Sequence, residues 1–197
     1  ERRYSRYRAN SVLSVINEVA AKGRAIKVDE ETSSLLNYAA TCYQQSDGLF
    51  DITSGVLRQV WHFKQQSLPN EQKIEAIRNK IGWQRLHWSE PQLEFPEAGL
   101  ELDFGGIVKE YAVDRAAVIG QELGMQHGVI NLGGDIRVVG PQYNGEPWLV
   151  GIQHPRKAKE AVKKIYLSCG ALASSGDYER CIVVDGQRYG HVFNPLT

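Results

Sequence analysis

Apolar residues in the first part of the chain recur at helical spacing. From Val12 to Gly23 they return every three or four positions, and Ser11 stands where an N-cap is expected. The same spacing predicts a helix over 35–45 and another over 70–81. One more helix is predicted just after the polar turn Asp51–Ser54.

Alternating apolar and polar residues become common later in the chain. Residues 127–140 alternate around the turn Gly133-Gly134-Asp135, which is typical of a β-hairpin. Asp185-Gly186 is a second strong hairpin signal. Further strands are predicted over 84–88, 92–95, 100–102, 147–155, 163–169, 178–186 and 188–193.

The order of these elements favours one fold class. Helices come first and most strands come last, with little regular alternation between the two. That order is typical of an α+β protein and not of a doubly wound sheet. We predict a single domain over residues 1–197, with a helical first part over about 1–82 and a strand-rich part over about 83–197.

Composition narrows the functional classes. The 197 residues carry 23 basic and 23 acidic side chains, so a nucleic-acid binder that relies on a broad positive field is disfavoured. No apolar run approaches the ~18 residues needed to cross a bilayer. The three cysteines lack CxxC spacing and give no zinc signal. The chain opens on Glu1-Arg2-Arg3 without a signal peptide, and we expect that an upstream segment has been removed.

The stretch 101–125 carries the strongest chemical signal. Asp103 is followed by two glycines and at once by an amphipathic helix. Asp103, the carbonyl of Gly106 and the ammonium of Lys109 recur at three-residue spacing, so they can converge around one ligand. An acid and a lysine at a helix start suit a phosphate bound with a metal. An ordinary turn before a helix, with a solvated lysine, explains the same pattern.

Common catalytic and nucleotide-binding motifs are missing from the sequence. The glycine pairs at 105–106 and 133–134 form neither a GxGxxG fingerprint nor a Walker loop, and no GxSxG is present. The histidines form no HExxH pair. His191 ends a predicted strand beside a polar turn, where it can serve as a general base or as a structural residue.

Six ordered blocks together resemble the ApbE family of flavin transferases, through nearly the whole chain. The blocks are Ser5-Arg6-Tyr7-Arg8 with Ser11 and Asn17; Gly48–Thr53 with Trp61 and Phe63; Asp103–Lys109 with Tyr111, Val113, Asp114 and Arg115; Asn131–Asp135; Ser174–Tyr178; and His191–Thr197.

This resemblance implies a fold, an activity and a set of site residues. It implies helices packed on an antiparallel sheet in a T-fold-like arrangement. It implies an enzyme that uses FAD and Mg²⁺, moves FMN onto a threonine hydroxyl of an acceptor protein and releases AMP. The Gly106 carbonyl would be a metal ligand, and His191 would take the proton of the threonine. The FAD site would be lined by Tyr7, Leu49, Phe50, Asp51, Asp103, Lys109 and Val192.

The sequence also departs from the family pattern. Glu110 stands where a glycine usually follows the lysine, and Asn194 replaces an acid. Family members continue with an acid- and threonine-bearing segment that supplies further magnesium ligands, and they carry an additional first strand. We expect either that these residues are a portion trimmed at both ends or that full metal coordination has been lost.

Alternatives to the transferase therefore stay open. One is an FAD pyrophosphatase that yields FMN and AMP, and another is a flavin-binding protein without turnover. By resemblance we expect a periplasmic or inner-membrane-anchored lipoprotein attached by an N-terminal lipid, with a cytoplasmic location as the alternative.

Overall fold

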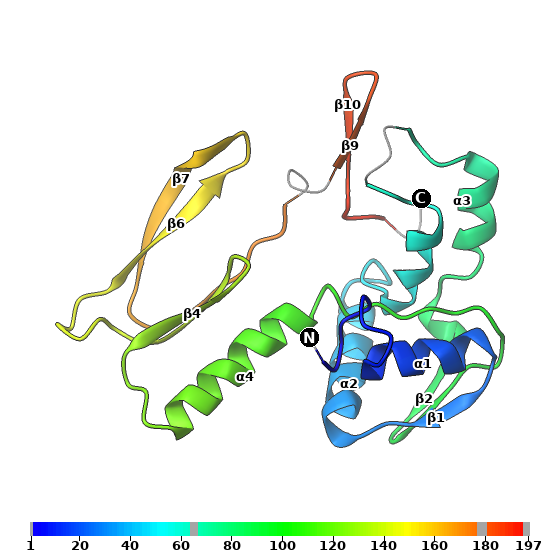
Figure 1. Cartoon of the computed structure of the whole chain (residues 1–197), viewed down its shortest axis with the longest axis horizontal. Coiled ribbons are helices and arrows are strands. Elements are labelled where there is room, and N and C mark those ends of the chain that lie inside the picture. The colour runs from blue at the N-terminus through cyan, green and yellow to red at the C-terminus, as the bar shows by residue number, and fades with distance from the viewer. Residues whose placement is uncertain (1, 64–66, 177–180, 195–197) are drawn as a thin grey trace. The chain divides into compact units, whose positions relative to one another are not determined.

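A computed structural model describes residues 2–63, 67–176 and 181–194. The chain divides into two compact units, which are coloured by residue number in Figure 1. Unit 1 comprises residues 1–106 and 182–197, and unit 2 comprises residues 107–181. Whether the whole chain acts as one domain stays a prediction.

The helices of unit 1 begin at the polar residues that the sequence offers as caps. Ser11, Asp29 and Asn70 each accept a hydrogen bond from a backbone N–H in the first turn of the helix that follows, which satisfies a donor that has no helical partner. The predicted helices are confirmed, although the third is a 3₁₀ helix. The elements are α1 (Val12–Ala21), α2 (Glu30–Gln45), η1 (Ile52–Gln59) and α3 (Glu71–Arg78). A short 3₁₀ turn, η2 (Trp83–Arg85), replaces the first part of the strand predicted over 84–88.

Short antiparallel strands complete unit 1. Strand β3 (Gln92–Glu94) lies between β1 (Ala25–Lys27) and β2 (His87–Ser89). Its central Leu93 is fully buried, which makes it a core position of this sheet. Strands β9 (Cys181–Val184) and β10 (Gln187–Gly190) form the predicted second hairpin around Asp185-Gly186. Both turn residues have positive φ, 50° and 78°, as such a tight turn requires.

The prediction of a strand over 100–102 is wrong, because this segment forms hydrogen bonds with groups that do not belong to a neighbouring strand. Leu102 N donates to Asn17 Oδ1 at 2.8 Å, and Asn17 Nδ2 donates to the Leu102 carbonyl at 3.0 Å. Asp103 N donates to the carbonyl of Ile52 at 2.8 Å. A side-chain amide and a helical carbonyl thus replace a neighbouring strand.

The same segment packs tightly against η1. Leu100, Leu102 and Phe104 are buried, so the chain enters the turn at 103–106 from the core of unit 1. A Cβ on Gly55 would lie 2.6 Å from the carbonyl oxygen of Glu101, so a larger residue would push η1 away. These contacts fix where Asp103 and Gly106 lie within unit 1.

Unit 2 combines one helix with two antiparallel sheets. Helix α4 (Val108–Glu122) packs on β4 and β5, the predicted hairpin. The first sheet has the order β4 (Gly128–Leu132), β5 (Asp135–Gly140), β8 (Gly170–Leu172). The second pairs β6 (Trp148–His154) with β7 (Lys157–Leu167). The short β8 had no clear pattern in the sequence.

Helices combined with strands that pair antiparallel confirm the α+β prediction. Among the described residues, no helix combines the length and the apolar character needed to cross a membrane.

The α2 cap yields a testable prediction on stability. Hydrogen bonds from Thr32 and the Arg3 guanidinium hold the pKa of Asp29 at about 2, below its ordinary value. This contribution to stability is complete above about pH 4 and is lost as the pH falls through the folded-state value. Because the side chain is 52% exposed, the charge contributes no more than about 1 kcal/mol.

We therefore expect Asp29→Asn, which can still cap, to flatten the acid limb of a urea-unfolding profile between pH 4 and pH 2. Asp29→Ala should cost about 1 kcal/mol more at pH 7 because the cap is lost. Glu30→Gln removes a charge from the same turn without touching the cap and is the control. An acid limb that is equally steep in Asp29→Asn and in wild type would contradict the assignment.

Candidate functional site

The turn after the buried segment is held by Asp103. Its Oδ1 accepts a hydrogen bond from Gly105 N at 2.8 Å, and its Oδ2 forms an ion pair with Arg6. Burial lowers the pKa of the Arg6 guanidinium, but the Asp103 carboxylate and Tyr7 outweigh it, so the net pKa is raised. Arg6 was not among the predicted site residues. Its position beside Tyr7 in the first block was the available signal.

Arg6 also organises the predicted FAD-lining tyrosine. Its guanidinium carbon lies 5.1 Å from the centre of the Tyr7 ring, and Nη2 donates to the Tyr7 hydroxyl at 3.0 Å. Tyr7 is nevertheless 75% exposed. An aromatic ring that is braced by an arginine and open to solvent can stack on a flat ligand.

The second block brings Phe50 to the glycine turn. A Cβ on Gly106 would lie 2.8 Å from Phe50 Cε2, so the ring rests directly on the backbone at Gly106. Leu49, in contrast, is half-exposed. Two predicted site residues, Phe50 and Gly106, are thus in contact, although they are more than fifty positions apart in the sequence.

The Asp51 carboxylate stabilises the local fold around η1. Its Oδ1 accepts from Thr53 N at 2.8 Å and from Thr53 Oγ1 at 2.6 Å, and its Oδ2 accepts from Trp83 N at 2.9 Å. The carboxylate caps η1, is 8% exposed and already has three donors. A contact between this segment and a ligand would therefore use its backbone or a neighbouring side chain.

His191 lies at the edge of an aromatic cluster in unit 1. Its ring and that of Phe63 are 6.4 Å apart at 84°, and Phe63 stacks on Phe193 at 28°. Trp61 meets Phe193 edge-on at 5.0 Å. The Nδ1 atom of His191 is buried and has no hydrogen-bond partner among the described residues. The adjacent Val192 is largely exposed.

Lys109 is the predicted site residue that lies in unit 2. It is in the first turn of α4, whose N-cap residue Ile107 makes no side-chain cap. Its ammonium lies 2.8 Å from Oδ2 of Asp135, which sequence reasoning did not select although it ends the fourth block. An uncapped helix start with a lysine can receive an anion.

The described residues do not by themselves complete a magnesium site. Among them, no group of three His, Cys, Asp or Glu side chains is arranged to hold a metal. Both oxygens of Asp103 are engaged by Arg6 and by Gly105. Only the Gly106 carbonyl remains of the predicted hard ligands, and Mg²⁺ prefers six oxygens.

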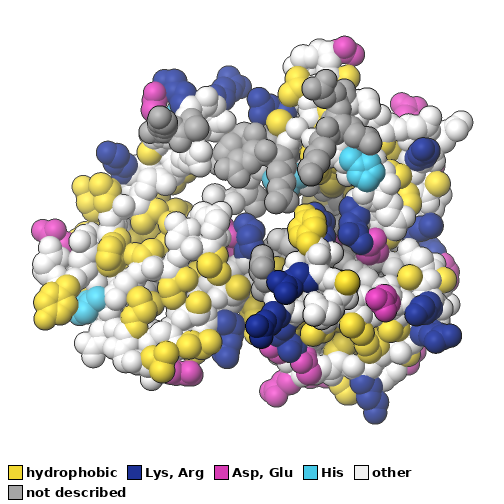
Figure 2. All heavy atoms as spheres, viewed as in Figure 1, with side chains coloured by type: hydrophobic (Ala, Val, Ile, Leu, Met, Phe, Trp, Pro, Cys, Tyr) yellow, Lys and Arg dark blue, Asp and Glu magenta, His cyan; other side chains and the backbone are white. Residues whose placement is uncertain are grey.

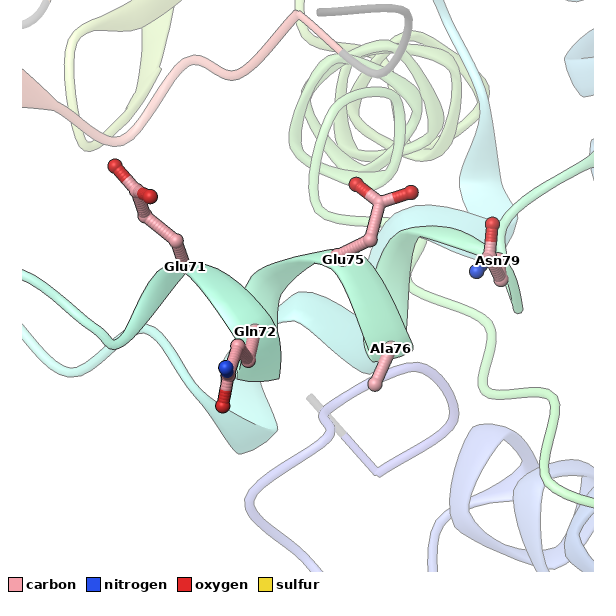
Figure 3. Close-up of a pocket in the computed structure, with 5 residues that line it drawn as sticks. All are labelled: Glu71, Gln72, Glu75, Ala76 and Asn79. Atoms are coloured by element: carbon pink, nitrogen blue, oxygen red, sulfur yellow. The ribbon is translucent and has the colours of Figure 1, made fainter.

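Two surface hollows lie away from the predicted residues. The first is bounded by one side of α3, so it cannot surround a ligand (Figure 3). The second lies in unit 2 and has a mixed polar and apolar lining. Its apolar lining consists of Val129, Ile136, Trp148, Leu149 and Val150. Hydrophobic side chains are also visible on the face of this unit shown in Figure 2.

Each of the two units carries a feature that can contact a ligand. Unit 1 is an α+β unit with a braced, exposed tyrosine, and unit 2 carries a lysine at an open helix start. An exposed aromatic ring can stack on a flat ligand, and a lysine at a helix start can contact an anion. The sequence model of the ApbE family matches residues 1–197, and the chain belongs to that family.

Named relatives and solved structures agree with this membership. The FAD:protein FMN transferase of Vibrio cholerae serotype O1 is 29% identical over 98% of this chain and 59% of its own length. The Chlamydia pneumoniae protein of the same name is 31% identical over 98% of this chain and 60% of its own length. The chain thus spans about three fifths of the curated relatives that it matches.

The fold similarity is close. The crystal structure of the ApbE protein from Thermotoga maritima superposes with a TM-score of 0.89 at 34% identity, covering 100% of this chain and 64% of that one. The flavin transferase ApbE of Vibrio cholerae gives a TM-score of 0.85 at 28% identity, covering 99% of this chain and 63% of its own.

The hydrogen bonds of Asp51 predict a loss of stability on substitution. Asp51→Ala leaves three donors without an acceptor, two of them buried, and should lower the free energy of unfolding by about 2–3 kcal/mol, measured by urea unfolding. Glu18→Ala, at an exposed position of α1, is the control for removing one acid. Unchanged stability in Asp51→Ala, combined with weaker FAD binding, would instead show that the carboxylate serves the ligand.

Proposed function

We propose that this protein transfers FMN from FAD to a threonine hydroxyl of an acceptor protein and releases AMP. The observation that carries the proposal is the family match over the whole chain, together with relatives named FAD:protein FMN transferase. The braced Tyr7 and the lysine of α4 are the chemical features that support it.

The proposed reaction is a phosphoryl-type transfer. The threonine oxygen attacks the phosphorus of the FMN half, the bond to the bridging pyrophosphate oxygen breaks, and AMP leaves with that oxygen. A new phosphoester joins FMN to the threonine, and the hydroxyl proton passes to a base. Such a reaction depends on positioning and on neutralising phosphate charge.

Each proposed site residue has a matching task. The Tyr7 ring, with the exposed side chains of Leu49 and Val192, offers apolar surface to a flavin or adenine ring. Lys109 would hold a phosphate oxygen with its ammonium. Asp103 and the backbone beside Phe50 would shape the FAD-binding surface of unit 1 through the turn that they stabilise.

His191 would act as the proton acceptor. Its Nδ1 is buried, which leaves Nε2 as the nitrogen for the threonine hydroxyl. The edge-on contact with Phe63 packs one side of the ring, as suits a base that must be held in place.

Magnesium dependence is part of the proposal, with the Gly106 carbonyl as one ligand. When bound, the ion would neutralise charge on the pyrophosphate. Because the described residues do not complete its coordination, no step above is assigned to it. The acceptor protein, a periplasmic lipoprotein location and the exclusion of nucleic acid as a partner are proposed in the same way, by family resemblance and zero net charge.

The proposal predicts that binding and transfer can be separated at His191. We expect His191→Asn to bind FAD as wild type does while transfer falls at least roughly 100-fold, because the general base is lost. The measurement is flavin fluorescence of a threonine-bearing acceptor on a denaturing gel, with FAD and magnesium present. His87→Asn, an exposed histidine of β2, is the control and should stay fully active.

The alternatives have distinct outcomes in this assay. FMN and AMP released without acceptor would favour a pyrophosphatase. Tight FAD binding without turnover would favour a flavin-binding protein. Equal transfer by His191→Asn and wild type would contradict the role of His191.

A further inference from the structure

We propose that Asp135 is a positioning residue, which holds the Lys109 ammonium where it meets the phosphates of the substrate. The inference deepens the proposed function and rests on it. Asp135 opens β5, directly after the Gly133-Gly134 turn. Lys109 and Asp135 both lie in unit 2, so their contact is internal to one compact unit.

The first observation is burial. The side chain of Asp135 is 3% exposed, whereas that of Lys109 is 50% exposed. An ionised carboxylate that is removed from water requires a counter-charge or hydrogen-bond donors. The Lys109 ammonium, 2.8 Å from Oδ2, is the cation that Asp135 contacts.

The second observation is the incomplete hydrogen bonding of this buried acid. Oδ1 accepts a long hydrogen bond of 3.4 Å from Ser174 N. Oδ2 has no well-directed donor among the described residues, so its contact with Lys109 is an ion pair without hydrogen-bond angles. Asp135 therefore depends on Lys109 for most of its compensation.

The third observation is that part of the Lys109 side chain stays exposed beside the ion pair. An ammonium has three donors, and half of this side chain is open to solvent. Lys109 can therefore contact Asp135 on one side and an anion on the other. The buried carboxylate reduces the rotational freedom of a long side chain, and a lysine fixed in advance loses less entropy when it binds a phosphate.

The turn before β5 keeps Asp135 in this place. Gly133 and Gly134 have φ values of 65° and 100°, and Gly134 N donates to Asn131 Oδ1 at 2.9 Å. This closed turn sets the direction in which β5 starts. Asp135, in the fourth sequence block, is thus held where it contacts Lys109, in the third block.

A second pair between the same helix and strand provides a control. Arg137 Nη1 lies 3.7 Å from Asp114 Oδ1, again joining β5 to α4. Both side chains are well exposed, 44% and 59%. This pair has the same elements and the same charges but no buried carboxylate, so its loss should cost little.

A positioning role and a purely electrostatic role of Asp135 predict opposite changes in FAD affinity when the residue is replaced. Asp135→Asn makes the surroundings of Lys109 more positive, so a purely electrostatic role would tighten binding of anionic FAD. If Asp135 positions Lys109, the same change weakens binding. The sign of one substitution therefore separates the two effects.

The main test is a double-mutant cycle on FAD affinity, measured by flavin fluorescence titration. We expect Asp135→Asn to weaken binding roughly tenfold, within the usual range of coupling between residues in contact. In a Lys109→Met background the same change should have no further effect, and Asp114→Asn should leave affinity unchanged. Tighter or unchanged binding in Asp135→Asn, or additive losses, would overturn the proposal.

A second readout does not depend on FAD. Reductive methylation of the ligand-free protein, followed by mass spectrometry, reports how freely each lysine reacts. Lys109 should react severalfold faster in Asp135→Asn, while Lys157, in its exposed pair with Glu160, is the internal reference. An unchanged rate at Lys109 would overturn the proposal. Faster reaction without FAD binding in any variant would refute the proposed function and leave the positioning intact.

Folding is controlled by a second variant. Asp135→Glu keeps the charge but displaces the carboxylate by one methylene. If Asp135→Asn does not fold, Asp135→Glu takes its place in the cycle. It should weaken FAD binding when Lys109 is present and should have no effect in the Lys109→Met background. Equal effects in both backgrounds would count against positioning.

Discussion

The hydrogen bonds between Asn17 and Leu102 are the constraint on which the geometry of unit 1 depends. One side-chain amide satisfies both backbone groups of a buried residue that has no strand beside it. Each such bond contributes about 0.5–1.5 kcal/mol, and leaving both groups unpaired would cost more. The segment enters the turn at Asp103 in one fixed position, so Gly106 meets the Phe50 ring and Asp103 meets Arg6.

The same physical requirement governs unit 2. The buried carboxylate of Asp135 is paired with Lys109, and the buried backbone of Leu102 is hydrogen-bonded by Asn17, so each contacts a group distant in sequence. In both units the compensating partner belongs to one of the family's sequence blocks. These two contacts link blocks, or a block and a buried segment, that lie far apart in the sequence.

Most helices and strands could be predicted from the sequence, whereas the contacts between residues far apart in the chain could not. Ser11, Asp29 and Asn70 are local caps, so the helices that they begin could be predicted from neighbouring residues. The segment 100–102 has the composition of a strand, but Leu102 is hydrogen-bonded by the distant Asn17 and not by a neighbouring strand. Arg6 and Asp135 were missed for the same reason, since their partners lie far along the chain.

The central claim is that FMN, and not another part of FAD, is joined to a threonine of an acceptor. Intact-mass and peptide mass spectrometry of the acceptor, after incubation with this protein, FAD and magnesium, tests it most directly. The account predicts one FMN added per acceptor, located on a threonine, with one AMP released for each. An unmodified acceptor, under conditions in which another ApbE-family transferase modifies it, would contradict the account.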